Sequence, residues 1–136
     1  MIVIIQALLE ATGRGLRARA SFAPDTSPLV AEFIGDEARL REAAGPIDVE
    51  LDFDSITRWA LAPMALTGLF PLADGEVAIV GRVTAIVDFE KTPPIVDLSL
   101  GRGIVSFETD ERTPKLQEGD FLAVHVLGLR CYPTWI

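Results

Sequence analysis

The sequence has few of the residues that most often anchor catalysis, metal binding or covalent cross-links. Among its 136 residues there is one cysteine, Cys131, and one histidine, His125. A lone cysteine excludes an internal disulfide, and a zinc site of the usual type needs several Cys or His ligands. A catalytic histidine needs an orienting carboxylate and a nucleophile, which no spacing in the chain brings to His125. We therefore expect an inert Cys131 thiol, a dispensable His125, and neither a cofactor nor a metal.

Basic residues are also scarce. The chain holds 12 Lys and Arg against 20 Asp and Glu, which gives a net charge of -8, and the charged residues are spread evenly along it. The electrostatic field of a negatively charged protein repels phosphate backbones and anionic lipids. Nucleic acids and membrane surfaces are therefore disfavoured as partners, and a basic protein is favoured.

Long apolar runs are absent as well. The run from Met1 to Leu9 is too short to cross a bilayer and no Lys or Arg precedes it, so we interpret it as a buried strand of a cytoplasmic protein. The composition, 49% hydrophobic and 24% charged, is that of a chain that folds. Its length suits one domain, so residues 1–136 are expected to form a single β-rich domain.

Hydrophobic residues alternate with polar ones over most of the chain, a pattern typical of half-buried strands. The clearest alternation runs from Ile47 to Ser55, and one helix is expected from Glu37 to Ala44, with Asp36 as its N-cap and Gly45 as its stop. Further strands are expected at 16–22, 77–89, 95–100, 104–108 and 121–129, and a loop is expected at 24–28. Residues 29–34 form either a short strand or the first turns of a helix, and 58–72 are left unassigned. This spacing predicts an all-β fold, a small barrel or sandwich with one short helix.

Two stretches of the sequence echo one another at an offset of 74 to 76 residues. Such an echo would arise from two related halves, residues 1–68 and 69–136, packed about a pseudo-two-fold axis. Reuse of the same turn residues in unrelated loops explains it equally well, so both readings stay open. The echoing residues are Phe33, Asp36, Glu37, Leu40, Glu42 and Gly45 in the first stretch, and Phe107, Asp110, Glu111, Leu116, Glu118 and Gly119 in the second.

The segment from Glu76 to Arg130 has a long strand with an internal glycine, then shorter strands, and a Gly-Asp turn before the last one. The residues that make this pattern are Val77, Gly81, Val83, Gly101, Gly103, Gly119, Asp120, Val124 and Val126. In this rhythm it resembles the oligonucleotide-binding (OB) barrels. The resemblance implies a barrel and, by analogy, a surface for a ligand. Binding of nucleic acid is not implied, because this half has few basic residues and lacks a row of aromatic stacking platforms.

Four acidic residues alternate with apolar ones, and a period of two places all four on one face of a strand. The four are Asp48, Glu50, Asp52 and Asp54. This acidic stripe would dock a basic partner or hold a divalent cation, although Phe53 stands where a calcium-binding loop needs glycine. The alternative is a solvated strand face, balanced by Arg17 and Arg19 on a neighbouring strand, whose neutralisation would change stability little.

The end of the sequence is apolar, and its aromatic residues Tyr132 and Trp135 are candidate interaction residues. Chain ends fray unless they are held, so we expect this segment to pack on its own domain or on another subunit. Gly13-Arg14-Gly15 and Gly101-Arg102-Gly103 could present amides and a guanidinium to an anion. Neither has the spacing of a phosphate-binding loop, so tight turns between strands are favoured.

Three functions remain open. The first is a small acidic, non-catalytic interaction protein, such as an inhibitor or a toxin-neutralising immunity protein. The second is an OB-like barrel that binds a small ligand or an oligonucleotide, which a pocket with a few polar groups would favour. The third is an enzyme that uses carboxylates, which would need a buried carboxylate pair with a raised pKa.

Overall fold

Strands make up most of the computed structural model, which describes residues 1–22, 28–101 and 103–135. Most of the loop expected at 24–28, together with Arg102 and Ile136, lies outside the described residues. The elements are, in chain order, β1 (Ile2–Ala11), β2 (Gly15–Ser21), β3 (Leu29–Ile34), α1 (Glu37–Glu42), β4 (Pro46–Asp52), β5 (Ser55–Leu61), β6 (Gly68–Pro71), the short 3-10 turn η1 (Ala73–Gly75), β7 (Val77–Phe89), β8 (Thr92–Ser99), β9 (Ile104–Glu108), β10 (Phe121–Leu127) and β11 (Arg130–Pro133). The all-β prediction is confirmed.

The first half of the chain forms a closed barrel in the order β1-β2-β3-β11-β4, with β4 pairing back to β1. Its closing strand, β11, comes from the far end of the chain and runs parallel to β3 and antiparallel to β4. Helix α1 connects β3 to β4 and contacts β2. Five strands closed with a crossed connection form the Greek-key barrel that OB folds share.

The second group of strands repeats this order. The sheet runs β5-β10-β7-β8-β9, and β6 adds to β7 beside it. Here β5, from the first half of the chain, takes the place that β11 has in the barrel. The resemblance to OB barrels implied a barrel for the C-terminal half. The sheet there has the strand order of the closed barrel but stays open, with β5 and β9 as its edges, and the closed barrel is built on the N-terminal strands.

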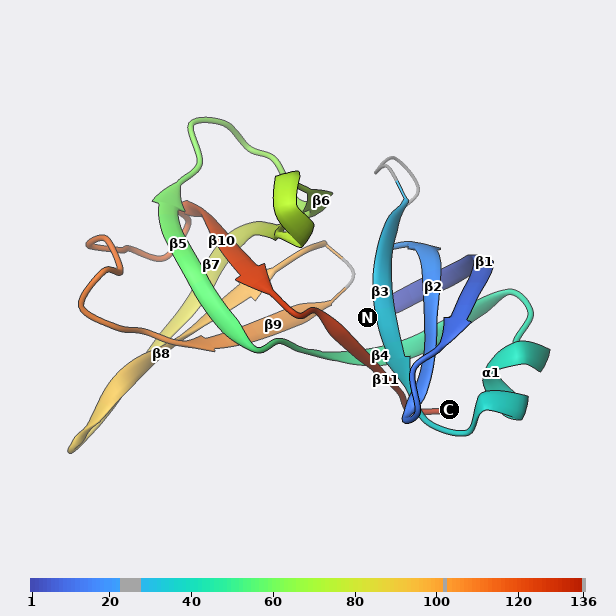
Figure 1. The fold of residues 1–136 in the computed structure, drawn as a ribbon. Coiled ribbons are helices and arrows are strands. Elements are labelled where there is room, and N and C mark those ends of the chain that lie inside the picture. Colours follow the sequence, from blue (N-terminus) through green and yellow to red (C-terminus); the bar gives the residue numbers. More distant parts are fainter. Residues whose placement is uncertain (23–27, 102, 136) are drawn as a thin grey trace.

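The two halves thus exchange their last strands. Figure 1 shows the chain crossing between the two groups of strands twice, once from β4 to β5 and once from β10 to β11. The pairing registers also repeat: Ile4 pairs with Ser21 in the first hairpin as Arg82 pairs with Ser99 in the second, and a β-bulge follows in each. The two groups of strands therefore share a strand order and the register of their first hairpin.

Aromatic side chains lie where the second sheet fails to close. Phe107 of β9 stacks on Phe53, which follows β4, with ring centroids 5.5 Å apart. Trp59 of β5 meets the same Phe107 edge-on, with centroids 6.1 Å apart. Since Phe107 and Trp59 are both buried, this aromatic seam joins the two edge strands without backbone pairing.

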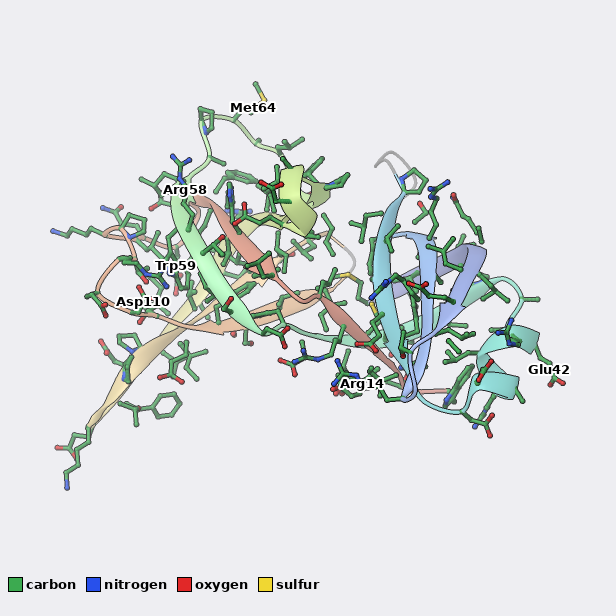
Figure 2. The ribbon with its side chains drawn as sticks, viewed as in Figure 1. Arg14, Glu42, Arg58, Trp59, Met64 and Asp110 are labelled. Carbon is green, nitrogen blue, oxygen red and sulfur yellow. The ribbon has the colours of Figure 1, made fainter. Side chains whose placement is uncertain are left out.

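Polar contacts from the segment after β9 reinforce the seam. The Arg112 guanidinium donates to the backbone carbonyls of Ile56 and Thr57 on β5. Asp110 holds this guanidinium and also accepts a hydrogen bond from the indole N–H of Trp59, and Figure 2 shows Trp59 and Asp110 on neighbouring segments. Arg112 thereby donates hydrogen bonds to β5 carbonyls that a neighbouring strand would bind in a closed sheet.

Several sequence-based boundaries are confirmed and others need correction. Strands β7 and β9 have the predicted bounds, and Asp36 caps α1 by accepting from the amides of Ala38 and Arg39. The helix ends at Glu42, two residues earlier than predicted, because the chain is already extended at Ala43. The stretch at 29–34 is the strand β3, and the unassigned stretch contains most of β5 and all of β6.

The run from Met1 to Leu9 is a strand, but the prediction that it is buried was wrong. Val3 is buried, whereas Ile2, Ile4, Leu8 and Leu9 are exposed. A barrel strand turns alternate residues outward, and two register shifts against β2 turn further residues to the surface. The apolar composition of this run therefore predicted more burial than β1 has.

Candidate functional site

The acidic stripe is not a uniform solvated face. Strand β4 ends at Asp52, three residues before the predicted end at Ser55. Val49 is buried, whereas Leu51 and Phe53 are half-buried. Asp48 is also half-buried and accepts a hydrogen bond from the amino group of Met1, 2.8 Å away. The Thr134 hydroxyl donates to its other oxygen. These two bonds lower the pKa of Asp48 below its ordinary value.

Arg130 on β11 neutralises the other end of the stripe. Its guanidinium donates to Asp52 across 3.0 Å and to Asp54, while its side chain is only 13% exposed. These bonds raise the pKa of Arg130 and lower the pKa of Asp52. The predicted balancing residues were Arg17 and Arg19, but the role belongs to Arg130, because β11 is the strand that pairs with β4 here.

We expect the Arg130→Gln variant to be less stable at pH 7 by about 1 kcal/mol, because two adjacent carboxylates lose their cation and both are mostly exposed. Since the pKa of Asp52 is lowered in the folded state, its contribution is complete above the ordinary carboxylate pKa of about 4 and is lost as the pH falls through the folded value. Urea unfolding of both proteins across a pH series measures this. The Glu50→Gln variant is the matched control, and an equal effect from it would contradict the assignment.

Of the two predicted aromatic interaction residues, Tyr132 interacts with Arg130 and helps to raise its pKa, whereas Trp135 contacts Arg39 instead. Tyr132 is exposed on β11, where it pairs in register with Glu50 of β4. Trp135 packs partly against the core, and the Arg39 guanidinium of α1 lies 4.3 Å from its ring centroid. The Arg39 contact with Trp135 is the kind of intramolecular packing expected for this end of the chain.

A row of alternating charge crosses four neighbouring strands of the barrel. In register, Arg17 of β2 faces Glu32 of β3, Glu32 faces Arg130 of β11, and Arg130 faces Asp52 of β4. Arg14, in the turn before β2, binds both oxygens of Glu32 through Nε and Nη2. The Arg14 contact is the main reason that the pKa of Glu32 lies below its ordinary value.

This charge row borders a groove of about 510 Å³ between the barrel and the start of the second half. Figure 2 shows Arg14 near the crossing segments that join the two groups of strands. The charged residues that line the groove are Arg14, Arg17, Glu32, Asp54 and Arg130. Its uncharged lining residues are Val30, Ala31, Gly75, Val77, Gly128 and Leu129. Its size is that of a small-molecule site, and its wall combines apolar residues with fixed polar groups.

Glycine is required where the crossing segments meet in the groove. A Cβ atom at Gly128 would lie 2.0 Å from the Asp54 carboxylate, and Gly128 has a φ of 71°. The close approach brings the Asp54 carboxylate against the second crossing segment and within reach of Arg130. The groove wall is thus built by the strand exchange itself.

The second half provides an internal comparison for the charge row. Counted from Ser21 and Ser99, the pair that corresponds to Arg17 and Glu32 is Ile95 and Glu108; counted from Phe33 and Phe107, it is Asp97 and Ser106. Neither pair joins opposite charges. The pair that corresponds to Asp52 and Arg130 is Leu127 and Ser55. The same strand order and register therefore form without the alternating charges. The row is a property of the N-terminal barrel, and the shared fold does not require it.

Sequence reasoning did not single out Glu32, and it assigned Arg14 to a tight turn. The turn is present, since Gly13 adopts a φ of 84° between β1 and β2, but its arginine lines the groove. The other Gly-Arg-Gly turn, between β8 and β9, has Arg102 outside the described residues. A signal for the site existed in the spacing of Arg17 and Glu32, which face one another once β2 and β3 are paired as a hairpin.

His125 and Cys131 lie in different sheets. His125 is on β10, half-buried, in register with Arg58 and Ala78. Cys131 is fully buried on β11, and burial raises the pKa of its thiol. Within the described ranges, no three His, Cys, Asp or Glu side chains group as metal ligands.

In the described part of the chain, the carboxylates with a perturbed pKa are all stabilised in the ionised form. The pKa is lowered for Glu32, Asp48, Asp52 and Asp110, in each case chiefly by a hydrogen bond from a cationic group. A general acid near neutral pH needs a shift in the opposite direction. What the groove offers chemically is hydrogen bonding from fixed, ion-paired groups.

Comparison of the chain with protein-family models, with curated proteins and with solved structures found no match. Within the described part of the chain, no helix has the length and apolar character that crossing a membrane would require.

Proposed function

We propose that this protein is a non-catalytic binding module whose ligand site is the groove bordered by the charge row. The observation that carries the proposal is the charge row itself, which borders the groove in one half, whereas the corresponding positions of the other half hold no pair of opposite charges. OB-type barrels bind ligands on the face of their second and third strands, and by that analogy β2 and β3 are the expected location.

The alternative, an acidic inhibitor or immunity protein that docks a basic partner, has less support from the geometry. Three carboxylates of the acidic stripe are engaged within the chain, by the Met1 amino group and by Arg130. A basic partner would have to compete with these bonds. Glu50 and the net charge of -8 would supply the remaining attraction.

A thermal-shift panel of small ligands that differ in charge and polarity tests the proposal. We expect at least one chemical class to raise Tm, because a ligand that binds the folded state stabilises it by mass action. The shift should be lost in Arg17→Gln and in Glu32→Gln, which remove groove hydrogen bonds.

Arg58→Gln is the control, because Arg58 lies on β5 and Figure 2 shows it far from Arg14. A ligand whose Tm shift persists in both groove variants would bind elsewhere and would contradict the proposal. So would a panel in which no ligand stabilises the wild-type protein.

A further inference from the structure

The charges of the groove are already balanced within the chain. Arg14 is bonded to both oxygens of Glu32, Arg17 to Glu10, and Arg130 to two carboxylates. An anionic ligand would have to displace a carboxylate from its guanidinium, and a cationic one would have to approach three arginines. Neither gains net attraction, because each charge in the groove has a partner of the opposite sign.

The ion pairs leave hydrogen-bonding capacity unused. A guanidinium carries five N–H donors. Asp54 accepts from Arg130 on Oδ1, and a carboxylate has about four acceptor positions in all. Donors and acceptors therefore stand side by side in fixed positions. A hydroxyl group is both a donor and an acceptor, so neighbouring hydroxyls can use such a surface without breaking an ion pair.

Apolar side chains form the remaining wall. Val30 is exposed on β3 and provides the accessible apolar surface, whereas Val77 and Leu129, in the two segments that enter from the second half, line the groove but are almost buried. Gly75 and Gly128, which have no side chains, also line the groove. An apolar surface next to fixed polar groups suits a ligand that has a C–H face and a hydroxyl edge.

We infer that the groove binds a neutral saccharide, whose hydroxyls bond to the Arg14–Glu32 and Arg130–Asp54 pairs while its ring packs on Val30. This inference rests on the proposed function, since it names the ligand class of the same groove. It differs from what net charge alone suggests, because the ligand is neither a basic protein nor an anion.

The test is a titration of the ¹⁵N-labelled protein, followed by NMR, with two kinds of probe. Maltose, cellobiose and lactose are the neutral probes, and glucose 6-phosphate, glucuronate and glucosamine are the charged ones. We expect at least one neutral probe to shift the amide signals of Gly75, Gly128 and Leu129, and the charged probes to leave them unchanged. Glu32→Gln should weaken binding about tenfold, the loss of roughly one hydrogen bond to a charged group.

Variants and outcomes separate the inference from the proposed function. Arg14→Gln, at an exposed side chain, replaces Glu32→Gln if the latter does not fold, and Arg58→Gln should bind as the wild type does. Shifts at the groove with charged probes alone overturn the saccharide inference and leave the groove as a binding site. Shifts that arise only outside the groove, or no shift with any probe together with a negative thermal-shift panel, overturn both.

Discussion

The Gly15→Ala variant is expected to lose about 3 kcal/mol or more of its free energy of unfolding, or to fail to fold. A Cβ atom at Gly15 would lie 1.8 Å from the backbone carbonyl oxygen of Phe33, on the strand paired with it. Because the obstacle is backbone in a closed barrel, no side chain can rotate away to relieve it. Overpacking of this kind costs about 1–3 kcal/mol where the neighbours can shift, and they cannot shift freely here.

Gly13→Ala in the same turn is the matched control. A Cβ atom there would meet nothing within 4 Å, and its φ of 84° carries a cost of about 1 kcal/mol for a residue with a side chain. Chemical denaturation of both variants measures the difference. Equal losses would mean that backbone strain in the turn, and not the approach of β2 to β3, decides the stability.

The Phe107→Ala variant is expected to lose about 3–5 kcal/mol, the usual cost of removing a buried phenylalanine ring. Phe107 is 1% exposed and is the ring that both Phe53 and Trp59 contact. Its removal leaves a cavity between β5 and β9, the two edges that no backbone pairing joins. Trp59 fluorescence should report the opening of the seam as well as global unfolding.

Phe89→Ala removes the same ring from the projecting end of β7 and is the control. Phe89 is 51% exposed, and Figure 1 shows the β7–β8 hairpin extending away from the other strands. We expect a change within about 0.5 kcal/mol there. A loss at Phe107 no larger than this would show that the seam does not hold the second sheet together.

Alternation and capping residues were enough to predict most elements of the fold. The strand from Val77 to Phe89 and the N-cap at Asp36 follow from local pattern, because period and capping are properties of neighbouring residues. The exchange of β5 and β11 does not follow from any local pattern. Pairing of Ser55 with Leu127 depends on which of two similar sheets a strand joins, and both sheets offer the same kind of apolar face.

The candidate site was harder to predict for the same reason. Asp52 was recognised as part of an acidic stripe, but its partner Arg130 lies 78 residues further along the chain and was not connected with it. The hairpin pair of Arg17 and Glu32 was within reach of sequence reasoning, and its relation to Arg130 was not. Which charged residues face one another across neighbouring strands can be stated only when the register of the sheet is known.

The exchanged strands also bear on the order in which the protein can form during its synthesis. The barrel begins at Ile2 but is closed by residues Arg130–Pro133, so its last pairing must wait until these residues, about 120 positions after β1, have emerged from the ribosome. Pairing of distant strands is slow, because the loop between them must first be ordered. Until then the parallel edge of β3 has no partner, and the nascent chain presents an open strand to its surroundings. The N-terminal half, although it contributes four of the five strands of the barrel, cannot finish folding before the C-terminal half has been made.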